Sequence, residues 1–319
     1  MNVPVLLLLF NRPDFTNQLI EKLRIIKPSK IYINIDGPRK ENLNEKILCK
    51  KVFDETKKID WKTEKHINVS DYNKGCRKSV REAIDWVFSK EKQAIILEDD
   101  CIPSSAFFDF CTELLIKYNN NNKIKVISGS NFQIKKIGEA DYYFSKYAHC
   151  WGWATWERAW NNYDNNMGFW ENFKTSQTWK DLHEYKLENK YWIKKFDLVK
   201  NYKIDSWAYV WLASVWFNKG LTITPNKNLV KNIGFGSTAT NTIGFENEIY
   251  SREISDEKIG MIKHPENIEN NKQADVYVFE NHFNGKYNFW PWRLFYLIKI
   301  LINNPSTFFK KIKKKVRLL

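Results

Sequence analysis

Residues 94–100 read Ala94-Ile95-Ile96-Leu97-Glu98-Asp99-Asp100, so that a short apolar run passes directly into three acids. A continuous apolar run of this length is typical of a strand that is buried on both faces of a sheet. Three carboxylates at the end of such a strand repel one another and lose solvation, which favours a positively charged ligand beside them. A solvated turn with the acids facing outward is the alternative. The stretch therefore predicts a buried strand with a candidate metal site at its carboxyl end.

The segments around this stretch alternate between strand and helix patterns. Further strands are predicted at Val3–Phe10, Ile31–Ile35, Lys65–Val69 and Val126–Ser128. Helices are predicted from a cap at Thr16 to Ile26, over Glu41–Thr56 and Lys78–Phe88, and from Pro103-Ser104 onward. This alternation predicts an α/β fold with a mostly parallel, Rossmann-like sheet that is flanked by helices on both faces.

Polar residues follow several of these strands. Arg12 comes after the first strand, Asp36 after the second, and Glu98-Asp99-Asp100 after the fourth. Ligands of such sheets bind at the carboxyl ends of the strands. We therefore expect these side chains to share one site. Arg12 could hold a nucleotide or its phosphates there, and Asp36 could accept a hydrogen bond from a base imide.

The second half, from about Tyr142 to Thr242, is rich in tryptophan. Ten of these residues lie there, at Trp151, Trp153, Trp156, Trp160, Trp170, Trp179, Trp192, Trp207, Trp211 and Trp216. An indole offers a large flat surface with one polar group, which suits the face of a carbohydrate. Buried aromatic residues also dominate protein cores, so roughly two-thirds of these side chains are expected to be packing.

The last thirty residues combine basic and apolar side chains. Residues 290–319 carry eight basic residues and no acidic ones, interleaved with residues such as Trp290, Trp292 and Phe295. A basic amphipathic segment with aromatic residues is typical of a helix that lies in an anionic membrane interface. A C-terminal helix that packs on the body with a solvated basic end is the alternative.

Composition excludes several classes of protein. With 43% hydrophobic and 16% aromatic residues, the 319-residue chain is not mostly disordered and can bury a full core. The net charge of +14 alone does not indicate nucleic-acid binding. Five scattered cysteines without a CxxC pair fit a reducing cytosol. No apolar run reaches the ~18 residues of a membrane-spanning helix, so none is expected.

Four motifs follow one another in the first half: Arg12 after an apolar strand, Asp36-Gly37, the basic turn Asn73-Lys74-Gly75-Cys76-Arg77, and Glu98-Asp99-Asp100. Their order resembles that of the GT-A nucleotide-sugar glycosyltransferases, and most of all the N-acetylglucosaminyltransferase I family and its bacterial relatives. The resemblance implies that the nucleotide donor is held by Arg12, Asp36, Arg77, Glu98 and Asp99. It also implies that Asp100 binds the metal cofactor, Mn²⁺ or Mg²⁺.

The resemblance continues to about residue 242. Residues 148–153 resemble the family's Gly-Trp acceptor segment, Asp205-Ser206-Trp207 its acid-acid-Trp motif, and residues 232–236 the stretch before a loop over the donor. The resemblance implies that Asp205 is the general base. It further implies that Trp151, Trp153, Trp207, Gly234 and Gly236 are acceptor or lid residues. A helix N-cap is the alternative for Asp205, a plain turn is the alternative for the Gly-rich loop, and Ser206 departs from the family's second acid.

Together these observations predict a catalytic domain with a tail. Residues 1–140 are expected to bind the nucleotide sugar, residues 141–282 to form the acceptor-binding half, and residues 283–319 to form a membrane-proximal basic tail. The resemblance implies inverting transfer of an N-acetylhexosamine from a UDP-sugar to a hydroxyl of a glycan or a lipid-linked glycan. Nucleic acid is not an expected partner. The predicted location is the cytoplasm, peripherally on the inner face of the cell membrane.

Two other functions remain open at this point. A sugar-1-phosphate nucleotidylyltransferase could share such a sheet, but it should carry a Gly-rich, basic loop directly after the first strand. The stretch Asn11-Arg12-Pro13-Asp14 contains no glycine. A non-catalytic protein that binds membrane surfaces would explain the tail, but not an acid cluster after a buried strand.

Overall fold

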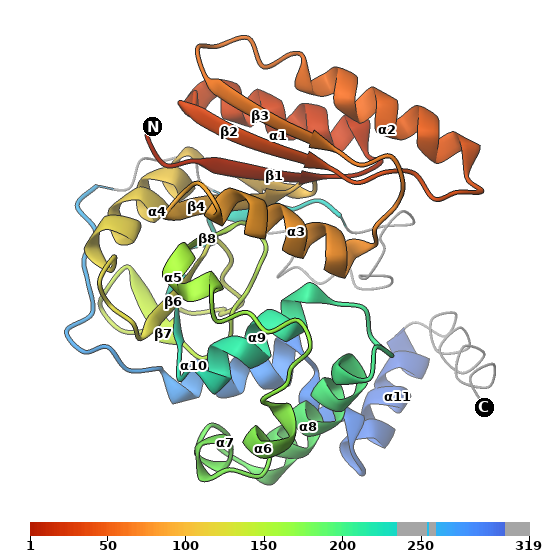
Figure 1. Cartoon of the computed structure of the whole chain (residues 1–319). Coiled ribbons are helices and arrows are strands. Elements are labelled where there is room, and N and C mark those ends of the chain that lie inside the picture. The colour runs from red at the N-terminus through yellow and green to blue at the C-terminus, as the bar shows by residue number, and fades with distance from the viewer. Residues whose placement is uncertain (235–253, 255–259, 304–319) are drawn as a thin grey trace.

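The computed structural model describes residues 1–234, residue 254 and residues 260–303. In this part of the chain the centre is an eight-stranded sheet with the order β3-β2-β1-β4-β8-β6-β9-β7 (Figure 1). Its strands are β1 (Val5–Leu9), β2 (Lys30–Ile35), β3 (Glu64–Val69), β4 (Gln93–Glu98), β6 (Ile124–Ser128), β7 (Tyr142–Ser145), β8 (Trp153–Trp156) and β9 (Leu221–Pro225). Strands β7 and β8 run antiparallel to their neighbours, and the other paired strands are parallel. The predicted α/β fold with a mostly parallel sheet is confirmed.

Helices cover both faces of the sheet, because successive residues of a strand point to opposite sides. Leu7 and Leu9 of β1 belong to the core cluster under α1 (Pro13–Ile26), α2 (Leu43–Thr56) and α4 (Ser105–Lys117). Leu6 and Leu8 belong to the cluster on the opposite face, under α3 (Cys76–Phe88). All five residues of β1 are buried, so the continuous apolar run does mark a strand that is covered twice.

Three predicted helix starts differ from the structure by two residues or more, and one of them is that of α3, which begins at Cys76 rather than at Lys78. Helix α1 begins at Pro13 rather than after Thr16, because proline has the backbone φ of a first helical turn and needs no hydrogen-bond partner for its nitrogen. The Thr16 hydroxyl donates to the carbonyl oxygen of Arg12 at 3.0 Å, inside the first turn. Helix α2 begins at Leu43, since the Asn42 side chain accepts a hydrogen bond from the Glu45 amide at 3.2 Å.

The second half of the chain completes the same sheet and adds a helical layer. Its helices are α5 (Glu157–Trp160), α6 (Trp170–Phe173), α7 (Gln177–Asp181), α8 (Lys186–Lys200) and α9 (Trp207–Phe217). Strand β8 pairs with β4 on one side and with β6 on the other. The predicted halves, 1–140 and 141–282, therefore share one sheet, and no structural boundary separates them at residue 140.

Most of the tryptophans are core residues. Nine of the ten in this half are buried, at Trp153, Trp156, Trp160, Trp170, Trp179, Trp192, Trp207, Trp211 and Trp216. Trp151 is the partly exposed one. Helix α9 is apolar on nearly every side, and it is buried between the sheet and α8 (Figure 1). The core thus takes more of these indoles than the expected two-thirds.

A buried ion pair ties β7 to α8. The Lys146 ammonium lies 2.8 Å from a carboxylate oxygen of Glu188, and the two side chains are 3% and 0% exposed. The hydroxyl of Tyr147 also donates to Glu188. Burial works to raise the pKa of Glu188, but the contacts with His183 and Lys146 outweigh it and lower the pKa to about 2. This charge is therefore paired in the native state over the whole neutral range.

We expect Glu188→Gln to lower the free energy of unfolding by about 3–5 kcal/mol, because it leaves the buried Lys146 without its counter-charge. The pH dependence has a definite sign. A depressed carboxyl pKa stabilises the protein above the unfolded-state value, and this contribution is lost as the pH falls towards 2. Urea unfolding at several pH values measures both effects. Glu41→Gln, at an exposed position, is the control. Equal stability of the two variants would contradict the prediction.

The C-terminal part of the described chain is helical. It contains α10 (Lys272–Tyr277), a π-helix (Val278–His282), a 3₁₀-helix (Gly285–Asn288) and α11 (Trp292–Asn303). Residues 243–253 and 255–259 lie outside the described part. All five cysteines are free. Within the described ranges, no helix has the length and apolar character needed to cross a bilayer.

Candidate functional site

The carboxyl end of β4 holds the acid cluster beside the end of β1. Glu98 is in register with Leu8, and the Asp99 amide donates to the Leu8 carbonyl at 3.1 Å. Arg12, the N-cap of α1, reaches across this edge. Its Nη2 and Nε atoms lie 2.5 Å and 3.2 Å from the two carboxylate oxygens of Asp99, which is a forked pair. Its Nη1 atom also lies 3.0 Å from Oδ2 of Asp100.

The cluster carries more negative charge than its arginine can balance. Three carboxylates face one guanidinium, and Asp99 is almost fully enclosed, with 3% of its side chain exposed. Burial raises the pKa of Glu98, and the charges of Asp100 and Asp99 raise it further. Glu98 and Asp100 are both partly exposed, with 15% of the Asp100 side chain accessible, whereas Asp99 is buried. A bound cation could therefore reach Asp100, on the side away from Arg12, as well as Glu98.

A second, two-stranded sheet packs next to Asp100. Strand β5 (Cys101–Pro103) follows the acids and pairs antiparallel with β10 (Val230–Asn232). The amide of Ile233 donates to the Asp100 carbonyl at 2.8 Å, and the Asn232 side chain lies 3.4 Å from Oδ1. The next residue, Gly234, packs so closely that a Cβ atom there would overlap the Asp100 carboxylate and lie 2.9 Å from its Cγ. Gly234 thus belongs to the site, and Gly236 lies outside the described residues.

Asp36 lies at the end of β2 and joins it to the turn before α3. Its Oδ1 atom accepts hydrogen bonds from the amides of Gly37 and Lys74, both at 2.9 Å. Its Oδ2 atom accepts one from the Asn73 side chain at 3.1 Å. Beside this junction is a hollow of about 580 Å³, whose lining includes Arg39, Asn73 and the 60% exposed Tyr72. The backbone of Gly75 also hydrogen-bonds to this buried carboxylate, so most of its acceptor capacity is used within the fold.

The N-terminus of α3 brings the separate acids together. Cys76, the first residue of α3, is close enough to four carboxylates for their charges to act on its thiol. Desolvation by the surrounding protein raises the pKa of this thiol most, followed by Glu98, Asp205, Asp36 and Asp100, to about 12. The thiol is therefore protonated at neutral pH and is a poor nucleophile. It marks the centre of a site built from the ends of β2 and β4 and the start of α9.

Asp205 faces this centre from the residue before the N-cap of α9. Its Oδ2 atom lies 3.6 Å from the position that a Cβ atom on Gly75 would take. Ser206 caps the helix, since its hydroxyl oxygen accepts a hydrogen bond from the Tyr209 amide at 3.3 Å. The alternative N-cap role for Asp205 is therefore wrong. Trp207 is buried behind it, so the exposed Asp205 carboxylate does not sit in an aromatic pocket.

Three of the predicted site residues have other surroundings. Arg77 is 4% exposed, and its guanidinium donates to the backbone carbonyls of Asn165 and Val199 instead of facing the acids. Trp153 and Trp207 stack on each other in the core, with ring centroids 5.6 Å apart and exposures of 1% and 2%. Arg77 holds the helical layer to α3, and the two indoles cannot contact a ligand without unpacking.

Trp151 belongs to an aromatic cluster that the sequence did not group. It lies 5.3 Å from the ring of Phe132 and 6.0 Å from that of His282. His282 stacks on Phe132 at 3.9 Å, and His149 meets His282 edge-on at 5.3 Å. Burial lowers the pKa of His282 to about 3, so its imidazole is neutral at neutral pH. The only sequence signal was the aromatic character of these segments.

Lys195 on α8 is a second residue that sequence reasoning missed. Its ammonium lies 5.5 Å from the ring centroid of Tyr191 and 5.3 Å from that of Tyr209. Burial, and after it the charge of Cys150, raises the pKa of Tyr209. Burial, and after it the charge of Glu98, raises the pKa of the Cys150 thiol. The i, i+4 spacing of Tyr191 and Lys195 could have placed them on one helix face, but only the tertiary structure brings in Tyr209.

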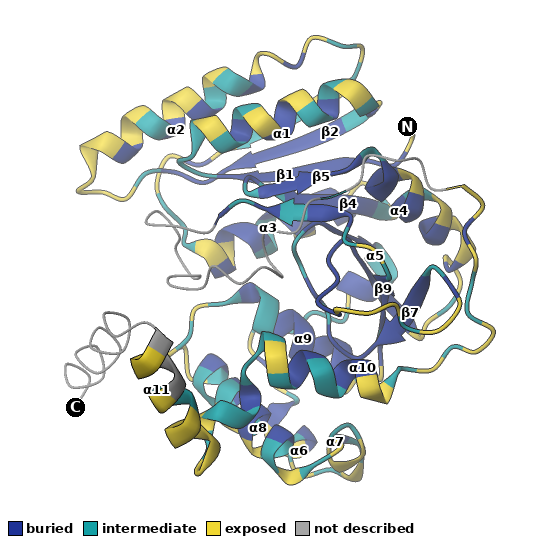
Figure 2. Ribbon diagram, turned by 180° about the vertical axis from the view of Figure 1, so that it is seen from behind, coloured by how far each residue is buried: buried dark blue, intermediate teal, exposed yellow. Residues whose placement is uncertain are grey.

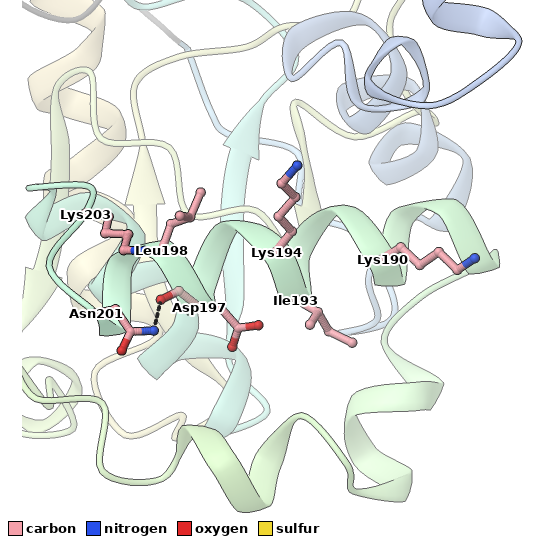
Figure 3. A pocket seen from close by; sticks show the side chains of 7 residues that line it. All are labelled: Lys190, Ile193, Lys194, Asp197, Leu198, Asn201 and Lys203. Carbon is pink, nitrogen blue, oxygen red and sulfur yellow. Dashed lines mark hydrogen bonds between the residues drawn. The ribbon is translucent and has the colours of Figure 1, made fainter. Parts of the chain in front are cut away.

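The outer face of α8 carries a separate hollow. Its lining side chains come from one helix and the turn after it, and they include Lys190, Lys194, Asp197 and Lys203 (Figure 3). The hollow has a volume of about 400 Å³. None of the residues around Asp100 lines it, so it is not part of the candidate site.

The site offers a metal the partly exposed carboxylates of Asp100 and Glu98 rather than a complete cage. In the described ranges, no three His, Cys, Asp or Glu side chains are grouped to coordinate an ion by themselves. Magnesium-type sites with one or two carboxylates complete their coordination with water and substrate phosphates. Asp100 fits that kind of site, in which the ion arrives with a diphosphate ligand.

Comparisons with known proteins do not place this chain in a family. No protein-family model matches it, and no curated protein is similar to it. The function must therefore be argued from the residues at the ends of β2 and β4 and the start of α9.

Proposed function

We propose that the protein is a GT-A-type glycosyltransferase that uses a divalent metal and a nucleotide-diphosphate sugar. The observation that carries this proposal is Asp100, a partly exposed carboxylate at the end of β4 that Arg12 and Gly234 hold in place. Asp36 and Asp205 approach the same centre from β2 and α9. Parallel sheets bind nucleotides at this edge, and a transferase needs a general base across from the donor.

The nucleoside fits beside Asp36. The 580 Å³ hollow beside Asp36 offers Tyr72 and Arg39 to a base and ribose. A UDP-linked donor and an N-acetylhexosamine as its sugar are carried over from the resemblance of the motifs.

The diphosphate fits between Arg12 and Asp100. Mn²⁺ or Mg²⁺ at Asp100 would neutralise the charge that develops on the leaving diphosphate. Arg12 has a fixed guanidinium fork, which can exchange part of its pairing with Asp99 and Asp100 for a phosphate oxygen. The carboxylate surplus of the cluster favours the metal-loaded donor over the free nucleotide, since only the former brings positive charge.

Asp205 fits the role of general base. Its exposed carboxylate lies across from Gly75, and no described residue donates a hydrogen bond to it. It can therefore accept the proton of an acceptor hydroxyl as that oxygen attacks the anomeric carbon. One base and a direct displacement give inversion at the anomeric centre. Trp151 and the neutral His282 offer an aromatic face for the acceptor glycan.

The alternatives find less support. The turn from β1 to α1 is short, contains no glycine, and points its arginine at carboxylates, unlike the phosphate-binding loop of a nucleotidylyltransferase. A purely membrane-binding protein would not require four carboxylates near one helix N-terminus, where they repel one another.

A thermal-shift panel with UDP, GDP, CMP, dTDP and ADP, each with and without Mn²⁺, tests the proposal. A ligand at 100 times its Kd adds about 2.7 kcal/mol to the free energy of unfolding. We expect a Mn²⁺-dependent shift with one nucleoside diphosphate, UDP, and none with Mn²⁺ alone. A well-folded sample that shifts with none of the five would contradict the donor site.

Gly234→Ala should weaken this Mn²⁺-dependent binding at least tenfold, because the new Cβ atom overlaps the Asp100 carboxylate. Overpacking of this kind also costs about 1–3 kcal/mol of stability. The control is Gly260→Ala, where a Cβ atom meets nothing within 4 Å. Isothermal titration with UDP and Mn²⁺ measures the affinities. If the folded Gly234 variant kept its affinity for UDP and Mn²⁺, the prediction that Gly234 adjoins the metal site would be wrong.

A further inference from the structure

Helix α11 exposes a row of large apolar side chains. Much of α11 is coloured as exposed in Figure 2. Leu294, Phe295, Ile298, Leu301 and Ile302 are 41%, 58%, 44%, 40% and 73% exposed. Their positions are i, i+1, i+4, i+7 and i+8, so they form one stripe along the helix. We call these five residues the α11 stripe. A contiguous exposed stripe of this kind is rare on a protein that works alone, and it marks a surface made for contact.

The opposite edge of α11 holds it to the body. The ring of Tyr296 stacks on that of Tyr287 with centroids 5.2 Å apart, and the Lys286 ammonium lies 5.8 Å from the ring centroid of Trp292. The 3₁₀-helix that carries Tyr287 and Lys286 in turn contacts α8. The stripe is therefore presented outward by a helix that is already anchored, rather than left over from a helix without neighbours.

The charge of this region indicates what covers the stripe. Glu280 is the last acidic residue of the chain. Arg293 is exposed on α11, and the sequence after the helix contains Lys310, Lys311, Lys313, Lys314, Lys315 and Arg317 in residues 304–319, which lie outside the described part. Exposed apolar side chains in a stretch of sequence that is basic and contains no acid match a surface with an apolar interior and a negatively charged outer layer. Exposed indoles at Trp290 and Trp292 suit the boundary of such a surface.

We propose that the α11 stripe inserts into the interface of an anionic lipid bilayer. The helix lies parallel to the membrane, with the stripe among the acyl chains and Arg293 at the headgroups. A second copy of the chain is a weaker match, because two such surfaces would bring their basic residues together. The proposal does not depend on the donor site, and it can hold or fail without it.

Vesicle co-sedimentation with the full chain tests this proposal. The probes are vesicles of phosphatidylcholine alone and of phosphatidylcholine mixed with phosphatidylglycerol. We expect binding to the mixed vesicles that weakens with added salt, and at least tenfold weaker binding by Ile302→Glu. Ile116→Glu is the matched control, since Ile116 is 68% exposed on α4, away from the stripe. It should bind as the unchanged protein does.

Three results would overturn the proposal. The first is equal vesicle binding by the Ile302 and Ile116 variants. The second is no binding of the unchanged protein to mixed vesicles. The third is a stable dimer in sedimentation analysis that Ile302→Glu dissociates, which would assign the stripe to a second copy. Circular dichroism of each variant confirms that it is folded, and nucleotide binding is measured separately, so that loss of the donor site is not mistaken for loss of docking.

Discussion

Asp205→Asn is expected to abolish sugar transfer while leaving nucleotide binding intact. Asparagine has nearly the shape of aspartate but cannot accept the hydroxyl proton, and general-base catalysis contributes about 10²–10⁴-fold to such rates. The Asp205 carboxylate carries no hydrogen bond from any described residue, so the substitution breaks no contact of the fold. Release of UDP from UDP-N-acetylglucosamine in the presence of octyl glycosides as acceptors measures turnover.

The adjacent residue provides the control for this experiment. Ser206→Ala removes the N-cap hydrogen bond of α9 and should cost about 1 kcal/mol of stability, with turnover retained. If Asp205→Asn kept its turnover, the proton would have to go elsewhere and the base assignment would fail. If the folded variant instead lost UDP binding, Asp205 would be a donor-binding residue.

Asp100→Asn is expected to remove the Mn²⁺-dependent part of nucleotide binding. A neutral amide is a weak ligand for a hard divalent cation, whereas the shape of the site is kept. Arg12 retains its forked pair with Asp99, so the local fold survives the change. The loss equals the stabilisation by ligand, about 2.7 kcal/mol at 100 times the Kd of the unchanged protein. Thermal unfolding with UDP and Mn²⁺ measures it.

A second carboxylate separates the metal from a general charge effect. Asp109 is exposed on α4, and Asp109→Asn removes the same charge outside the acid cluster. This variant should keep the full shift with UDP and Mn²⁺. A shift that survives in Asp100→Asn, or that disappears in both variants, would show that Asp100 is not the metal ligand.

Local patterns were sufficient to predict the parallel part of the sheet. The apolar run before Glu98 is buried on both faces, and the strands at the ends of which Arg12 and Asp36 lie are adjacent to it in the order β2-β1-β4. Crossover connections between parallel strands bring their carboxyl ends to one edge. For this reason the sequence alone could predict that Arg12 and the acids meet.

The antiparallel strands and the fate of several side chains could not be predicted in this way. Strand β8 lies between β4 and β6 in the sheet, although more than fifty residues separate it from β4 in the sequence. Its pairing therefore depends on partners that a short stretch of sequence does not contain. Arg77 belongs to a basic segment that was expected to hold the donor. In the structure its guanidinium instead donates to the backbone carbonyls of Asn165 and Val199. Long-range partners decided both outcomes.

The sequence by itself determined the strand and helix order and the edge at which the acids gather, because periodicity and backbone direction are local properties. Only the tertiary structure decided which acids stay accessible, which tryptophans are core, and that Ser206 rather than Asp205 caps α9. Exposure depends on every segment that packs against a side chain. For the same reason, the sequence shows that α11 is apolar, but only the packing of the helix against the rest of the protein decides which of its apolar residues are exposed.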